Sequence, residues 1–258
     1  MNRIQQLTQQ VAPAPSAPIA TTDQVLQAGI CRHGLDHAVF APLHYEPNYA
    51  YPLVVWLHGP DDNERQLQRI MPLVSMRNYV AVAPRATSCV GQRSSSYAWN
   101  HSLSGIMDGE QRVFDCIEAV QEKFHVAPRR VFLAGFRCGG TMAFRIALKN
   151  PSRFAGVLSA GGPFPADHNP LIYLQQVRQL PLFIAQGRLS QRYPVERACE
   201  ELRLFHAAGL AVTLRQYPGG DELSAQMLHD MNIWMMEQVT GVEMNSERHG
   251  QARPGEAN

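Results

Sequence analysis

The sequence predicts an α/β fold in which helices cover both faces of a mostly parallel central sheet. Six short apolar runs alternate with helical patterns, and each run ends at glycine, proline or polar residues. Runs that are apolar on both faces suit strands buried inside a parallel sheet, and their alternation with helices implies right-handed crossovers. The expected strands are residues 52–59, 79–85, 131–136, 154–162, 181–187 and 211–217.

Helices are expected between these strands. The segment His37–Leu43, which precedes the first parallel strand, is predicted to be an antiparallel edge strand. Pro151 and Gly209 follow two of the helical patterns and mark their ends. The expected helices are Glu64–Met76, Ser104–Phe124, Thr141–Lys149, Val195–Ala208 and Leu223–Val239.

The length and composition favour one large domain. The chain has 258 residues, of which 45% are hydrophobic and 17% are charged, so we expect a sizeable core. We predict a flexible Ala/Pro-rich segment at residues 1–23, a single domain at residues 24–240, and a flexible tail at residues 241–258.

Several classes of function are disfavoured by composition. The formal net charge of +1 does not indicate a polyanionic partner, so nucleic acid is not expected. No apolar run is long enough to span a membrane, and the first residues lack the apolar core of a signal peptide. The five cysteines show no C-x-x-C pair and no zinc spacing, which favours reduced thiols and a cytoplasmic location. No metal site and no cofactor fingerprint is present.

One stretch, "VFLAGFRCGG", carries the strongest functional signal. An apolar run leads to Gly135, and Gly139 follows four residues later, as in the strand–turn–helix pattern G-x-S-x-G that presents a nucleophilic serine. The residue between the glycines is Arg137. A protonated guanidinium has no free lone pair and cannot attack a carbonyl carbon.

Five segments in order resemble the phospholipase/carboxylesterase group of α/β-hydrolases. They are "WLHG", "LAGF..GGTMAFRIAL", "SAGGPFP", "PVERA" and "YPGG.EL", and the resemblance covers roughly residues 43–239. It implies the α/β-hydrolase fold. It also implies carboxylic-ester hydrolysis by a serine, a histidine and an aspartate, with backbone N–H groups holding the oxyanion.

By position, all three catalytic roles are vacant in this chain. The nucleophile position falls on Arg137, the acid position on Ser190 within "GRLSQRYP", and the histidine position on Asp221 within "YPGGDEL". We therefore predict no catalytic residues of the family type. One oxyanion donor, the N–H of Cys138, survives any side chain, but the loop after "WLHG" continues with Pro60, which has no N–H.

Seven residues of this region, the three triad positions among them, are predicted to bind a ligand. They are His58, Gly59, Pro60, Arg137, Cys138, Ser190 and Asp221, with His58 expected to brace its loop. Two hypotheses stay open for Arg137. It forms an ion pair with Asp221, or it stands at a helix N-terminus as a site for a carboxylate or phosphate, helped by Arg188 and Arg192. Without a nucleophile to present, the strained turn is expected to relax.

Three functions follow from this pattern. The first is a non-catalytic homologue that binds a small anionic or ester-like ligand or acts as a regulator. The second is a carboxylic-ester hydrolase with a rearranged site, in which Cys138, its thiol pKa lowered by the helix start and Arg137, works with a non-standard base such as His168. The third is a scaffold that pairs with a second copy or a related hydrolase.

Overall fold

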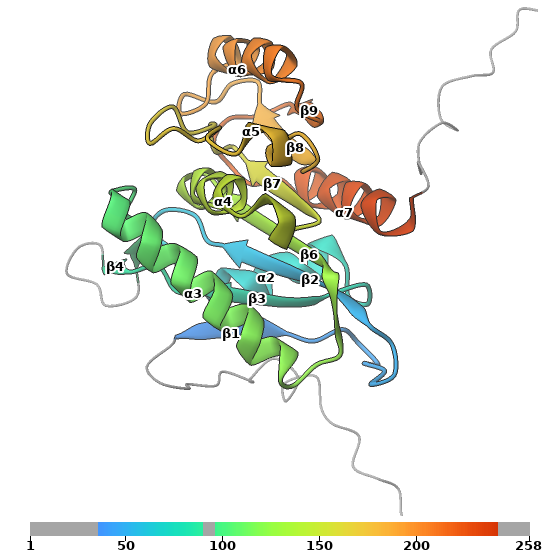
Figure 1. The fold of residues 1–258 in the computed structure, drawn as a ribbon. Coiled ribbons are helices and arrows are strands. Elements are labelled where there is room, and N and C mark those ends of the chain that lie inside the picture. Colours follow the sequence, from blue (N-terminus) through green and yellow to red (C-terminus); the bar gives the residue numbers. More distant parts are fainter. Residues whose placement is uncertain (1–35, 90–95, 242–258) are drawn as a thin grey trace, which may run out of the picture.

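The computed structural model describes residues 36–89 and 96–241, which fold around a seven-stranded sheet (Figure 1). Strand β1 pairs antiparallel with β3, and the other neighbouring strands are parallel. The mostly parallel sheet and its antiparallel edge strand are thus confirmed. The spatial order is β1 (His37–Phe40), β3 (Val80–Pro84), β2 (Tyr51–Leu57), β6 (Val126–Phe136), β7 (Gly156–Ala160), β8 (Leu182–Gly187) and β9 (Val212–Tyr217).

Helices cover both faces of the sheet, as the sequence predicts. One face packs against α2 (Gln66–Val74) and α7 (Ala225–Thr240). The other packs against α3 (Leu103–Gln121), α4 (Cys138–Lys149) and α6 (Val195–Ala208). Smaller elements are α5 (Leu174–Val177), the 3-10 turn η1 (Pro151–Arg153) and the ribbon of β4 (Ser88–Cys89) and β5 (Tyr97–Ala98). Within the described ranges, no helix has the length and apolar character that crossing a membrane requires.

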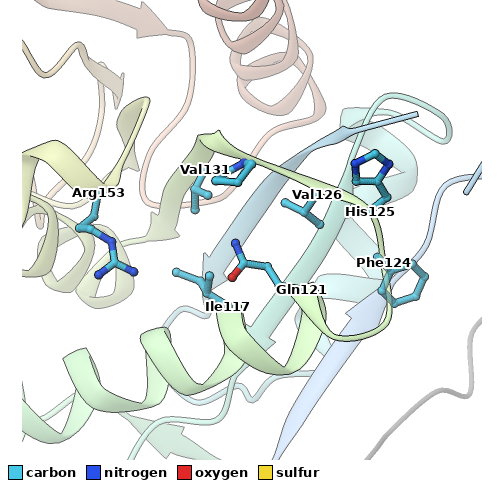
Figure 2. A pocket seen from close by; sticks show the side chains of 8 residues that line it. Ile117, Gln121, Phe124, His125, Val126, Val131 and Arg153 are labelled. Carbon is cyan, nitrogen blue, oxygen red and sulfur yellow. The ribbon is translucent and has the colours of Figure 1, made fainter. Parts of the chain in front are cut away.

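Strand β6 begins earlier than the sequence predicts and contains a bulge. Tyr51 of β2 pairs with Val126 and Leu53 with Val131, so residues 127–130 of β6 stand opposite the single residue Pro52. Those four residues are displaced from the ladder, and Pro128 among them has no N–H to donate to it. Figure 2 shows Val126 and Val131 on either side of this bulge, above the last turns of α3.

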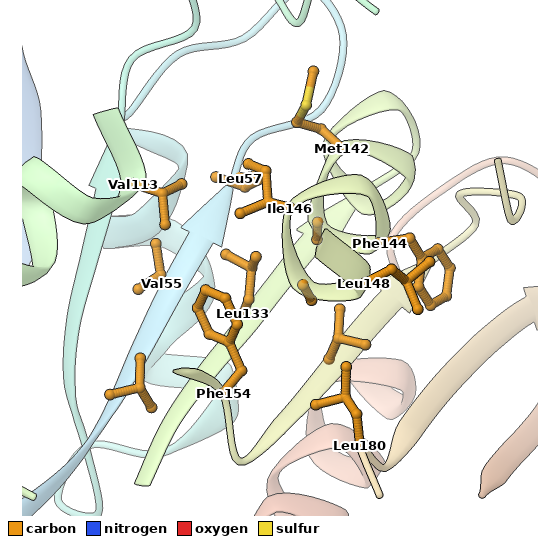
Figure 3. Close-up of a cluster of buried hydrophobic side chains, with 14 of the residues drawn as sticks. Val55, Leu57, Val113, Leu133, Met142, Phe144, Ile146, Leu148, Phe154 and Leu180 are labelled. Carbon is orange, nitrogen blue, oxygen red and sulfur yellow. The ribbon is translucent and has the colours of Figure 1, made fainter. Parts of the chain in front are cut away.

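The core consists of two layers, one on each face of the sheet. Along β2, Leu53, Val55 and Leu57 belong to the layer under α3 and α4, while Val54 and Trp56 belong to the layer under α2 and α7. Figure 3 shows part of the first layer, where side chains of α4 and the strands interlock. Burying each such side chain contributes about 1.5–3 kcal/mol, and this burial holds the strand ends that carry the site.

The strand order fixes where a site can form. The chain passes from β3 on one side of β2 to β6 on its other side, so the loops after β2 and β6 separate at their C-terminal ends. Open α/β sheets generally bind ligands in a crevice at such a switch point. The segments expected to be flexible, residues 1–23 and those after 241, lie outside the described residues, as does Cys31.

Candidate functional site

The residues predicted to form a site gather at the C-terminal edge of the sheet. His58 follows β2, Arg137 follows β6, Ser190 lies in the loop after β8, and Asp221 lies in the loop after β9. All four strands run parallel, so these loops meet at one edge.

The turn at Arg137 keeps the geometry of a nucleophile elbow. Arg137 has φ +50° and ψ −115°, a region that L-residues seldom adopt, and its N–H donates to the carbonyl of Ala160 at 2.8 Å. The expected relaxation of the turn is therefore wrong. The dense packing around the turn holds Arg137 in this conformation at a cost of about 1–3 kcal/mol.

Glycines make that packing feasible. A Cβ on Gly135 would lie 2.5 Å from the carbonyl carbon of Gly139, and one on Gly139 would lie 2.2 Å from the carbonyl oxygen of Leu57. Strand β6, helix α4 and strand β2 thus approach backbone to backbone. This also explains why α4 begins at Cys138, directly after the turn, rather than at Thr141 as the sequence indicates.

Ser190 and Asp221 meet, as the acid and histidine positions of a hydrolase do. The Ser190 hydroxyl donates to Asp221 Oδ1 at 2.6 Å and accepts from the N–H of Tyr193 at 2.9 Å. Close backbone contact brings the two loops together, because a Cβ on Gly187 would lie 2.1 Å from the carbonyl oxygen of Gly220. The site therefore holds a serine–aspartate pair at the two positions to which the resemblance assigns an aspartate and a histidine.

Asp221 is ionised and partnered without Arg137. Burial opposes its ionisation, but hydrogen bonds from Ser190 and from the N–H of Arg192, with the positive charge of Arg137 nearby, outweigh that effect and lower the pKa of Asp221 from its ordinary 3.8. Among the described residues, neither an ion pair nor a hydrogen bond joins Arg137 to Asp221. The hypothesised ion pair is thus not formed, because Asp221 is already held by the loop after β8.

The guanidinium of Arg137 consequently keeps its donors. Within residues 36–89 and 96–241, no side chain or carbonyl accepts a hydrogen bond from it, and it lies half-buried at the first turn of α4. Arg188 and Arg192, on the neighbouring loop, are exposed. Three cations therefore lie on the loops after β6 and β8, at the same edge of the sheet as Asp221.

His58 braces the loop after β2 instead of lining the crevice. Its ring is completely buried, Nδ1 lies 2.8 Å from the carbonyl oxygen of Gly59, and Nε2 accepts from the N–H of Ala86 at 3.2 Å. These partners assign the proton to Nδ1. Burial lowers the pKa of His58, so the ring is neutral. Gly59 is likewise buried, and half-buried Pro60 is the member of this segment that solvent reaches.

Sequence reasoning missed a second brace, Gln66. Its Oε1 accepts from Trp56 Nε1 at 2.7 Å and from the N–H of Gly59 at 3.1 Å, while its Nε2 donates to Asp62 at 2.9 Å. The one signal in the sequence was a polar residue at the start of an otherwise apolar helix face. Gln66 consumes the N–H of Gly59, which leaves that loop with fewer free donors.

The structure does not pair Cys138 with His168. Burial raises the pKa of the Cys138 thiol above its ordinary value and outweighs the opposing influence of nearby backbone N–H groups and Arg137, so the expected lowering is wrong. His168 instead faces Asp167, with its Nε2 at 3.4 Å from a carboxylate oxygen. In the described part of the chain, no hydrogen bond links this histidine to the thiol, and no cluster of histidine, cysteine and acidic residues could hold a metal ion.

Sheet order, elbow and meeting loops together define an α/β-hydrolase. Residues 33–193 match the model of the Esterase family, described as "Putative esterase". The chain belongs to that family.

Known proteins agree with this assignment. The chain is 25% identical over 201 residues to a bifunctional acetylxylan esterase/xylanase of Neocallimastix patriciarum, covering 75% of this chain and 28% of that protein. It is 28% identical over 179 residues to a protein of Nocardia uniformis subsp. tsuyamanensis described as "Putative esterase NocK", covering 60% of this chain and 50% of that protein. The chain thus spans at most half the length of these curated relatives.

Solved structures show the same fold. A carboxylesterase of Mesorhizobium loti superposes with a TM-score of 0.64 at 13% identity, covering 78% of this chain and 94% of that one. SOBER1 of Arabidopsis thaliana superposes with a TM-score of 0.61 at 19% identity, covering 74% of this chain and 100% of that one.

Proposed function

We propose that this esterase-family protein is catalytically inactive as a serine hydrolase and acts as a binding or regulatory protein. The observation that carries the proposal is the content of the three triad positions: Arg137 on an intact elbow, and Ser190 hydrogen-bonded to Asp221. Arg137 offers no nucleophile. Ser190 lies in the wrong loop, and its hydroxyl proton is committed to an ionised carboxylate.

The ligand of the crevice is a small carboxylate or ester-like molecule. Three features support this: the unpartnered donors of Arg137 within the described residues, the start of a 12-residue helix beneath it, and the exposed Arg188 and Arg192. A regulatory role would act through a second copy or a related active hydrolase. A cytoplasmic location fits the free thiols of the four described cysteines.

The competing proposal is an ester hydrolase built on Cys138. It requires a thiolate and a base within hydrogen-bond reach. The raised pKa of Cys138 and the position of His168 argue against both requirements.

Hydrolysis of p-nitrophenyl acetate tests these alternatives. The native chain is expected to show no turnover above the buffer rate. A triple variant, Arg137→Ser, Ser190→Asp and Asp221→His, is expected to turn over, because it places a serine, an aspartate and a histidine at the three positions that the resemblance assigns to them.

A double variant with Arg137→Ser and Ser190→Asp is the matched control, since it has the nucleophile but no base. Turnover by the repurified native chain that disappears in Cys138→Ala would contradict the proposal. If no variant hydrolyses the ester, the loop at Pro60 also fails to bind the oxyanion, because proline has no N–H to donate.

A further inference from the structure

A pocket lies at the opposite edge of the sheet from the candidate site, where strand β6 begins. The bulge at residues 127–130 lifts the chain away from β2, and the C-terminal end of α3 and the turn η1 close the space from two sides. The pocket, here the β6-start pocket, has a volume of about 430 Å³. That volume falls within the range of small-molecule sites. It is separated from Arg137 by roughly 20 Å of strand, counted from Val131.

The floor of the β6-start pocket is apolar and its rim is polar. The apolar lining consists of Ile117, Phe124, Val126, Pro128 and Val131. Three polar side chains complete it: Gln121 of α3, His125 of the α3–β6 connection and Arg153 of η1. In Figure 2, Gln121 rises from α3 in the middle of the pocket, with Arg153 at one end and His125 at the other.

The charge of this lining has one sign. Arg153 is a cation, and none of the residues that line the pocket is acidic. Within the described residues, the side chains of Arg153 and Gln121 form no ion pair and no hydrogen bond. The acidic residues of the last turns of α3, Glu118 and Glu122, are exposed and do not line the pocket.

The side chain of Arg153 is exposed, and its guanidinium lies over an aromatic ring beside the pocket. Its central carbon lies 4.8 Å from the centre of the Phe114 ring, and that ring stacks on Phe154 at 6.1 Å. A cation resting on an aromatic face keeps its N–H edges free while its long side chain is ordered. Ordering a donor in advance removes part of the entropy cost of binding.

We propose that the β6-start pocket binds a small organic carboxylate with a flat apolar body. The body rests on the floor formed by Ile117, Val126 and Val131, which are buried beneath the opening. The carboxylate lies between Arg153, whose planar fork matches its two oxygens, and the amide donor of Gln121. This site is independent of the function proposed for the Arg137 crevice.

Isothermal titration with 2-naphthoate tests the proposal. The native chain is expected to bind 2-naphthoate saturably. The uncharged 2-naphthamide should bind about fivefold more weakly because it forms no charge-assisted bond, and acetate should bind weakest because it has no apolar body.

Variants locate the probe. Arg153→Gln is expected to weaken 2-naphthoate binding about fivefold, with Arg153→Lys in between, and Gln121→Trp should abolish it by filling the pocket. Arg129→Gln removes an exposed cation of the bulge that does not line the pocket, and it should leave affinity unchanged. Thermal unfolding checks that each variant is folded, and Gln121 is exposed, so its substitution tests the pocket even if Arg153→Gln is unstable.

Three results would overturn the proposal. One is no saturable binding of 2-naphthoate by the native chain. Another is equal loss in Arg129→Gln and Arg153→Gln, which would indicate unspecific attraction by positive charge. The third is loss in Arg137→Gln with full binding in Arg153→Gln and Gln121→Trp, which would place the probe in the crevice.

Discussion

The two ends of strand β6 differ in how closely the chain packs around them. At its C-terminal end, Gly135 and Gly139 let three backbone segments meet without side chains between them. At its start, residues 127–130 leave the ladder and open a pocket. The dense end keeps a strained residue, Arg137, at the elbow although arginine is not a nucleophile. The shape of a catalytic turn and the chemistry of its tip residue are therefore separable properties of the sequence.

Among the substitutions that test this difference in packing, Gly139→Ala should change the free energy of unfolding most. Its Cβ would meet the carbonyl oxygen of Leu57 at 2.2 Å, and two backbone segments cannot yield cheaply. We expect the free energy of unfolding, measured by urea titration, to fall by about 3 kcal/mol.

Gly109→Ala in α3 is the matched control. Its Cβ would lie 3.6 Å from Met142 Sδ, which is ordinary contact, and alanine favours a helix over glycine. The free energy of unfolding should rise by about 0.5–1 kcal/mol. Equal losses in both variants would contradict the packing argument.

Ser190→Ala should have the next largest effect. It removes the bond to Asp221 and leaves the Tyr193 N–H without its acceptor, so we expect a loss of about 1–2 kcal/mol at neutral pH.

The stability that the hydrogen bond between Ser190 and Asp221 contributes should depend on pH. The pKa of Asp221 is lowered from 3.8 in the folded chain, so the stability that its ionised form contributes is present above that value and is lost as pH falls through the lowered pKa. Urea titrations of the native chain and Asp221→Asn at several pH values should therefore converge in acid. A constant difference would contradict the role assigned to the carboxylate.

Arg137→Gly should stabilise the protein by about 1 kcal/mol, because glycine adopts φ +50° without strain. Arg137→Ala keeps the strain and is the control. Both variants remove the arginine side chain, so the difference between their urea midpoints reports the cost of the strained backbone at residue 137. Equal midpoints would show that the turn is not strained.

Arg129→Gln should have the smallest effect. The residue is exposed on the bulge, and we expect a change within about 0.5 kcal/mol in the same urea assay. A loss comparable to that of Gly139→Ala would show that the start of β6 is as tightly constrained as its end.

Much of the fold could be predicted from local patterns. Buried parallel strands and the glycines at 135 and 139 leave clear signals, because each depends on a few neighbouring residues. The resemblance also located Ser190 and Asp221, which do meet. The bulge at 127–130 left no such signal, since it is defined by its register against β2.

The side-chain network was harder to predict for a physical reason. Whether Asp221 pairs with Arg137 or with Ser190 depends on distances between loops that are far apart in sequence. The direction in which the pKa of Cys138 shifts depends on burial, and the position of this residue at the start of a helix does not reveal its burial. The hydrogen-bond partners and the burial of an ionisable group depend on the tertiary structure, whereas helices and strands depend largely on neighbouring residues in the sequence.

His58 has a consequence for the behaviour of the protein in acid. The unfolded chain accepts a proton on this ring near pH 6.5, but in the folded chain burial of the ring opposes its protonation and lowers its pKa. A proton on Nε2 would also break the hydrogen bond that this nitrogen accepts from the N–H of Ala86. Its contribution to stability is complete above pH 6.5 and declines as the pH falls from there through the lowered native pKa. Mild acidification thus weakens the hydrogen bond by which His58 joins the loop after β2 to the loop after β3.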